Sequence, residues 1–210
     1  MLELGDKQKL IYCIAHVCNG HACRSIRIIL LLGLAIAAFA QNDFLEAHNQ
    51  IRRQERGAAN MKMMSWSPEL ATVAQRWANT CREGHNPRRS SSSYRNLGEN
   101  IYRRTDRASA IDVVKNWYSE KRQYNFNYNH CFGVCGHYTQ VVWADSDALG
   151  CGVAYCRNLF GGRGGYNYVC NYGPAGNWNG KKPYIAGRQC SRCPRGYRCQ
   201  NGLCAKSAWK

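Results

Sequence analysis

The chain has 210 residues, with 29 lysines and arginines against 13 aspartates and glutamates, and a formal net charge of +16 at neutral pH. Such a positive field favours anionic partners, namely acidic phospholipid, sulfated glycans or acidic proteins. No nucleic-acid reading motif is present, and the secretion predicted below also argues against a nucleic-acid partner. The residues that follow the signal peptide predicted below are enough for one domain that buries roughly 70% of its unfolded surface.

An apolar segment lies near the N-terminus. Residues 28–40 are all apolar or glycine, Arg24 and Arg27 precede them, and the segment ends in small residues. A transmembrane helix needs roughly 18 or more apolar residues, so this segment fits a cleaved secretory signal better. We predict that residues 1–40 are an N-terminal extension with a signal peptide, that the mature chain begins near Gln41, and that the protein is secreted. The alternative is a signal anchor.

Three segments carry apolar residues at helical spacing. In the second, Ser67 can cap the helix, and Pro68 occupies the first turn, where a missing N–H costs nothing. In the third, Ser109 and Asp112 form a capping-box pattern. The predicted helices are residues 43–56, 67–82 and 109–120.

The sequence after the third helix is rich in valine, tyrosine and tryptophan, which favours β-strands. The first of these strands places His137 at its entrance. The glycine-rich residues 161–165 predict a flexible hairpin tip between the last two. Helices followed by antiparallel strands indicate an α+β domain. The polar residues 90–93 and 124–130 are expected to lie on the surface. The predicted strands are residues 138–143, 149–156 and 166–172.

Cysteine usage indicates an oxidising compartment. Three of the thirteen cysteines lie within residues 1–40. The remaining ten are an even number and imply five disulfides, but the spacing does not determine which cysteines pair. The last four lie close together and are expected to pair with one another. The alternative is a zinc knuckle, because Cys190 and Cys193 have ligand spacing. The ten are Cys81, Cys131, Cys135, Cys151, Cys156, Cys170, Cys190, Cys193, Cys199 and Cys204.

Four short segments occur in a fixed order. Residues 135–143 read CGHYTQVVW, residues 170–178 read CNYGPAGNW, residues 48–52 read HNQIR, and residues 98–101 read GENI. These segments resemble the hallmarks of the CAP superfamily, which comprises cysteine-rich secretory proteins, venom antigen 5 and pathogenesis-related 1 proteins. Asn167 departs from the pattern, because the strand before the second segment is usually apolar or aromatic.

The resemblance implies a CAP/SCP fold, an α-β-α sandwich followed by a small disulfide-stapled hinge. The layout is similar to that of the glioma-pathogenesis-related and peptidase-inhibitor-like members. The expected parts are the CAP/SCP domain at residues 41–178, a linker at 179–189, a cysteine-rich hinge at 190–204 and a tail at 205–210.

The resemblance also implies a site of two histidines and two glutamates around one cavity. The matching positions are His85, Glu99, Glu120 and His137. Imidazole nitrogens suit zinc or another divalent cation, so His85 and His137 are the expected metal ligands. The same groups could instead transfer protons, or form a buried polar network that fixes the fold. No organic cofactor is expected.

Other singled-out residues are interpreted as structural. The resemblance gives His48 and Arg52 scaffold contacts in the first helix, and His130 is expected to face water. Four tryptophans occupy apolar-periodic positions typical of a core. They are Trp66, Trp77, Trp117 and Trp143.

The leading hypothesis is a secreted, non-enzymatic protein whose cleft binds a small apolar ligand such as a sterol or fatty acid, an anionic ligand, or an extracellular protein partner. One alternative is an extracellular hydrolase, a protease or esterase using the His/Glu pair, or a glycosidase using Glu99 and Glu120. The chain has neither Gly-x-Ser-x-Gly nor His-Glu-x-x-His, which argues against common hydrolase classes. A further alternative is a basic effector that binds an anionic glycan or membrane surface.

Overall fold

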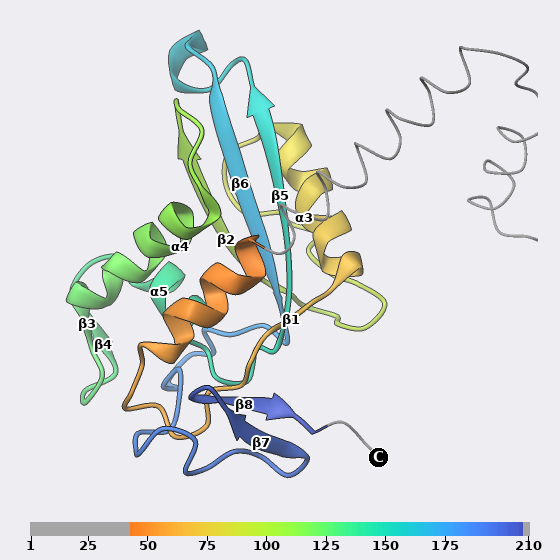
Figure 1. Ribbon diagram of the computed structural model, residues 1–210. Coiled ribbons are helices and arrows are strands. Elements are labelled where there is room, and N and C mark those ends of the chain that lie inside the picture. Colours follow the sequence, from red (N-terminus) through yellow and green to blue (C-terminus); the bar gives the residue numbers. More distant parts are fainter. Residues whose placement is uncertain (1–42, 208–210) are drawn as a thin grey trace, which may run out of the picture. The chain divides into compact units, whose positions relative to one another are not determined.

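A computed structural model describes residues 43–207 (Figure 1). The predicted signal peptide and the three cysteines within residues 1–40 lie outside the described residues. Within residues 43–207 no helix combines the length and the apolar character needed to cross a bilayer. Residues 43–53 form the first described helix. The other elements are β1 (Ser65–Trp66), α3 (Pro68–Thr80), β2 (Gly98–Arg104), α4 (Ala110–Ser119), η1 (Glu120–Gln123), β3 (Tyr124–Asn125), β4 (His130–Cys131), α5 (Gly136–Val141), β5 (Ala148–Cys156), η2 (Phe160–Gly162), β6 (Gly165–Gly173), β7 (Tyr197–Gln200) and β8 (Leu203–Lys206).

The centre of the fold is a four-stranded sheet in the order β1-β5-β6-β2. Strands β5 and β6 form a long antiparallel hairpin, β2 pairs antiparallel with β6 at one edge, and β1 pairs parallel with β5 at the other. Helix α3 covers one face, and the helix of residues 43–53 together with α4 and α5 covers the other (Figure 1). The predicted α+β fold, an α-β-α sandwich, is confirmed.

Helices α3 and α4 start where their caps predict. The Ser67 hydroxyl accepts a hydrogen bond from the Leu70 N–H at 3.3 Å, and Pro68 is the first helical residue. In α4 the Ser109 hydroxyl accepts from the Asp112 N–H and donates to the Asp112 carboxylate at 2.6 Å. Both helix starts are set by neighbouring residues, which is why the sequence predicts them well.

Helix α3 lies directly on β5 because two glycines of that strand face it. A Cβ at Gly150 would overlap the backbone of Leu70 and Ala71, and a Cβ at Gly152 would overlap the backbone of Gln75. The Gln75 side chain accepts from the Val153 N–H and donates to the Val153 carbonyl, so helix and strand are also hydrogen-bonded.

The opposite face carries the main core, and the C-terminal hinge belongs to it. The Met63 N–H donates to the Cys204 carbonyl, and the Cys204 N–H donates to the Met61 carbonyl, each at 2.8 Å. Leu203 is fully buried in the same apolar cluster as the helices. The hinge is thus packed onto the domain through its second strand, β8. Residues of this cluster include Phe44, Ile51, Val113, Val114, Trp117, Tyr138, Val141, Tyr168, Tyr172 and Leu203.

The predicted strand at residues 138–143 is wrong, because residues 136–141 form helix α5. The buried residues Tyr138, Val141 and Val142 recur at helical spacing. The N–H groups of His137 and Tyr138 donate to the Glu120 carboxylate at 3.0 and 3.1 Å. An acidic side chain distant in sequence therefore stabilises the N-terminal turn against a local preference for strand.

Two further elements differ from the prediction. Strand β2 was not predicted, since it is recognisable only through its pairing with β6, where Glu99 lies opposite Asn171. The first helix ends at residue 53 rather than 56. The predicted β5–β6 hairpin is confirmed, with the short helix η2 near its tip.

All ten described cysteines form five disulfides, as predicted. Cys81–Cys156 joins the end of α3 to the end of β5, and Cys151–Cys170 joins two directly opposed residues of β5 and β6. Cys131–Cys135 closes a short loop before α5. The hinge cysteines pair with one another, so they are not free zinc ligands. Their pairs are Cys190–Cys199 and Cys193–Cys204.

Replacing Gly152 by alanine is expected to lower the free energy of unfolding by about 2 kcal/mol or more. The added Cβ would overlap the backbone of Gln75, which cannot move aside as a flexible side chain does. Gly57→Ala is the control, since its added Cβ meets nothing within 4 Å. Urea unfolding of the oxidised variants measures the difference. Equal stability of the two variants would contradict the close packing of α3 on β5.

Candidate functional site

His85 and Glu99 form the first pair of the site. Glu99 lies on β2 with its side chain fully buried, whereas the His85 side chain, in the loop after α3, is 53% exposed. One Glu99 oxygen is 2.9 Å from His85 Nδ1 and accepts from the Asn86 N–H; the other accepts from Asn171 Nδ2 at 3.3 Å. The carboxylate partner places the proton of neutral His85 on Nδ1, which leaves the Nε2 lone pair available.

His137 and Glu120 form a second pair of the same design. Glu120 begins η1, directly after α4, and one of its oxygens lies 2.6 Å from His137 Nδ1. The His137 ring stacks on Trp117, with ring centroids 6.3 Å apart and planes 16° apart. In both pairs the carboxylate occupies Nδ1, and no described residue forms a hydrogen bond with Nε2.

Strand β2 connects the two pairs. Glu99 holds His85, and the next residue, Asn100, donates from Nδ2 to the His137 carbonyl at 3.0 Å. Successive strand residues point to opposite faces, so an edge strand can reach both sides of the sheet. Asn100 Nδ2 also lies 3.2 Å from the Tyr172 hydroxyl, which anchors this link to the core.

The structure arranges the four predicted residues as two hydrogen-bonded pairs. Within residues 43–207, only Cys190, Cys193 and Cys204 place three ligand atoms within 4.8 Å of one another, and these cysteines are oxidised. No three ligand atoms of the tetrad are therefore that close. Joint binding of one ion by all four residues stays a prediction.

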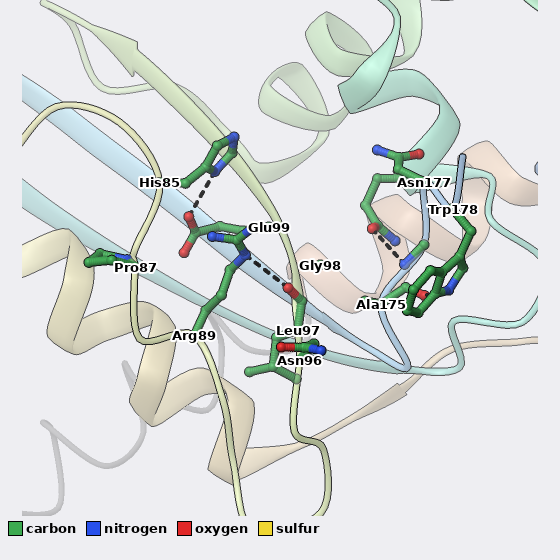
Figure 2. A pocket seen from close by; sticks show the side chains of 12 residues that line it. His85, Pro87, Arg89, Asn96, Leu97, Gly98, Glu99, Ala175, Asn177 and Trp178 are labelled. Carbon is green, nitrogen blue, oxygen red and sulfur yellow. Dashed lines mark hydrogen bonds and ion pairs between the residues drawn. The ribbon is translucent and has the colours of Figure 1, made fainter. Parts of the chain in front are cut away.

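A hollow of about 460 Å³ adjoins the first pair. Figure 2 shows His85 and Glu99 facing one another on one side of it and Trp178 on the other, with Arg89 nearby. Glu120 and His137 are not among its lining residues. A second hollow of about 350 Å³ shares Asn177 and Trp178 with the first. The lining of the first is His85, Pro87, Arg89, Asn96, Leu97, Gly98, Glu99, Gln140, Ala175, Gly176, Asn177 and Trp178.

Comparison with protein-family models identifies the fold family. The model of the cysteine-rich secretory protein family, CAP, matches residues 45–172. The chain belongs to the CAP family.

Individual relatives agree. The chain is 43% identical to mouse GLIPR1-like protein 1 over 167 residues, 77% of this chain and 70% of that protein. It is 44% identical to mouse glioma pathogenesis-related protein 1 over 76% of this chain, but spans only 62% of that longer protein. The crystal structure of NaASP2 with Zn²⁺ matches with a TM-score of 0.64 and 32% identity, over 79% of this chain and 94% of that one.

Nucleophilic catalysis by a serine, threonine or cysteine requires its hydroxyl or thiol beside a base. In the described part of this CAP chain, the side-chain partner of each site histidine is a carboxylate, and neither imidazole forms a hydrogen bond with a hydroxyl or thiol. The ten cysteines are oxidised. The geometry thus offers two imidazoles that are each oriented by a carboxylate, and within residues 43–207 neither one is hydrogen-bonded to a hydroxyl or thiol.

Sequence reasoning missed a buried carboxylate that supports the second pair. Glu55 is 3% exposed, and one of its oxygens accepts from Tyr118 Oη and Lys121 Nζ, each at 2.8 Å, with Tyr138 Oη at 3.4 Å. Its other oxygen accepts from Tyr184 Oη at 3.1 Å. Burial and the hydrogen bond to Glu55 raise the pKa of Tyr118 above its ordinary value.

Glu55 acts on the two backbone segments that carry the second pair. Lys121 directly follows Glu120, and Tyr138 directly follows His137. One buried charge therefore clamps η1 to α5. No periodic pattern marks Glu55, and its four partners lie 63 to 129 residues away, so no local signal could have revealed it.

Replacing Glu55 by glutamine is expected to lower the free energy of unfolding by about 2–4 kcal/mol, because buried donors lose a charged acceptor. Glu46→Gln is the matched control, since its ion pair with Arg53 is at the surface and should contribute less than about 1 kcal/mol to the free energy of unfolding. Denaturant unfolding separates the two. A loss of similar size in both variants would refute the clamp.

His48 and Arg52 have the structural roles expected of them. His48 is fully buried, donates from Nδ1 to the Phe44 carbonyl at 2.7 Å, and accepts at Nε2 from the Tyr172 hydroxyl at 2.8 Å. Burial lowers the pKa of His48 to about 4, although the bond to Phe44 opposes the shift. Arg52 is also fully buried, and burial lowers its pKa to about 9, so it stays charged at neutral pH. Its guanidinium donates to the carbonyls of Lys62, Val141, Trp143, Ala144 and Ser146.

Acid is expected to destabilise the domain through His48. The unfolded chain takes up a proton near the ordinary pKa of 6.5, whereas folded His48 resists protonation down to about pH 4. The stability contribution is present above pH 6.5 and is lost as the pH falls between these values, by about 2–3 kcal/mol at pH 4.5. Urea unfolding of the wild type and of His48→Gln across this range should show a shallower pH dependence in the variant. Identical slopes would disprove the assignment.

Proposed function

We propose that this CAP protein is secreted and binds a divalent cation, zinc foremost, through Nε2 of His85 and His137, with an adjoining cleft that receives a ligand. The observation that carries the proposal is the repeated arrangement of a carboxylate on Nδ1 and a hydrogen-bond-free Nε2. This is the geometry by which proteins orient metal-binding histidines. A cation held by two imidazoles would leave positions for water or for a ligand atom from the cleft.

Two comparisons support the proposal. The solved NaASP2 structure contains Zn²⁺, and that protein shares 32% identity with this chain. A relative of this chain, guinea pig cysteine-rich secretory protein 2, is named as a secretory protein and is 40% identical over 80% of this chain. Five disulfides are also typical of an extracellular protein.

The lining of the described hollow favours a polar ligand over a sterol or fatty acid. Half of its lining residues are polar or charged, and they include His85, Arg89 and Glu99. We infer that lipid binding by this protein would have to use another surface. An extracellular protein partner could still dock over the same opening.

Zinc titration by calorimetry tests the metal proposal. The wild-type chain should bind near pH 7 and lose at least about tenfold in affinity near pH 5, where protons compete for imidazole. His85→Ala and His137→Ala should each weaken binding by about tenfold or more. His130→Ala is the control, because this histidine is exposed and its ring meets Phe132 edge to face, outside the two His/Glu pairs. Equal zinc affinity in all variants, or at both pH values, would overturn the proposal.

A further inference from the structure

Trp178 lines two hollows and presents an exposed ring. Its side chain is part of the lining of both hollows, and the residue is 54% exposed. The indole N–H donates to the Ala175 carbonyl at 2.9 Å, which fixes the ring orientation. An immobilised aromatic face that is open to solvent is a ready stacking platform.

The segment that carries this ring is anchored to α5. The Thr139 hydroxyl donates to Asn177 Oδ1 at 2.7 Å, and Asn177 Nδ2 donates to the Gly136 carbonyl at 2.8 Å. The Gly176 N–H donates to the buried Gln140 side chain at 3.0 Å. Little conformational freedom is left to lose when a ligand packs on Trp178.

Arg89 supplies an oriented cation in the first hollow. Its Nε donates to the Leu97 carbonyl at 3.1 Å and its Nη1 to the Asn86 carbonyl at 3.0 Å. Among the described residues no carboxylate lies within 4.0 Å of this guanidinium, and the structure shows no hydrogen bond from Nη2. A partly buried guanidinium held by neutral carbonyls and lacking an anion favours a carboxylate or sulfate ligand.

Charge and shape point to one ligand class. The opening is a polar groove in a strongly basic chain, and its lining includes a flat aromatic face and a fixed guanidinium. A lipid would leave these polar groups without partners, and a simple inorganic anion would not use Trp178. A sugar ring offers an apolar face for the indole, hydroxyls for the polar rim, and an acidic substituent for Arg89.

We propose that this groove binds an acidic oligosaccharide, with a uronate carboxylate or a sulfate on Arg89 and a sugar ring stacked on Trp178. The inference rests on the proposed ligand-binding cleft and names its ligand class. It does not require a metal ion, so the two proposals can fail separately.

The test measures binding of defined tetrasaccharides to the full mature chain by calorimetry at about 0.15 M salt. The probes are a sulfated heparin-derived tetrasaccharide, a hyaluronan tetrasaccharide with carboxylates only, and neutral chitotetraose. At least one acidic probe should bind saturably and more tightly than the neutral one. Comparing the two acidic probes shows whether sulfate or carboxylate is the preferred group.

Trp178→Ala and Arg89→Gln should each weaken this binding by about tenfold or more. Trp178→Phe should retain most of it, because the platform remains. Tyr155→Ala and Arg188→Gln are matched controls that remove an exposed aromatic ring and an exposed cation outside the lining of either hollow. Both controls should bind like the wild type, and thermal melting should confirm that every variant is folded.

The inference is overturned if neither acidic probe binds saturably, if the neutral probe binds equally well, or if the two site variants bind like the controls. Repeating the titration with EDTA and with His137→Ala protein, whose substituted residue does not line this hollow, separates the proposals. Loss of zinc binding with saccharide binding retained supports this groove and leaves the metal site as an independent feature. Saccharide binding that disappears with the metal would contradict the assignment to Arg89 and Trp178.

Discussion

The buried negative charge of Glu99 organises the residues of the candidate site. The Glu99 carboxylate has no exposure to solvent, so its charge requires compensation from within the protein. His85, the Asn86 N–H and Asn171 provide it, and they draw the loop after α3 against the edge of the sheet. Because β2 is an edge strand, the neighbouring Asn100 can simultaneously hold the backbone of His137 on the other side.

The second histidine is held by two further buried charges. Glu55 clamps the residues that follow Glu120 and His137, and Arg52 donates to carbonyls at and after the end of α5. Both charged side chains form hydrogen bonds with backbone or hydroxyl groups that would otherwise need water as a partner. The position of His137 therefore depends on the first described helix and the residues directly after it, as well as on α5 itself.

Much of the fold could be predicted where the determinants are local. Ser67 and Ser109 mark helix starts, and the close spacing of the hinge cysteines indicates their mutual pairing. Helix α5 could not be predicted, since its cap comes from Glu120, and β2 becomes a strand only through β6. The site positions came from the family resemblance alone. Their pairing, the clamp at Glu55 and the platform at Trp178 depend on contacts between distant segments, for which a single sequence gives no signal.

The central claim is that the two imidazoles, each oriented by its own carboxylate, act on one ligand. Anomalous X-ray scattering at the zinc edge, from crystals of the full mature chain grown with zinc near neutral pH, tests it most directly. The account predicts one strong peak about 2.1 Å from Nε2 of both His85 and His137. A peak at only one of them, or zinc bound instead at the exposed His130, would contradict it.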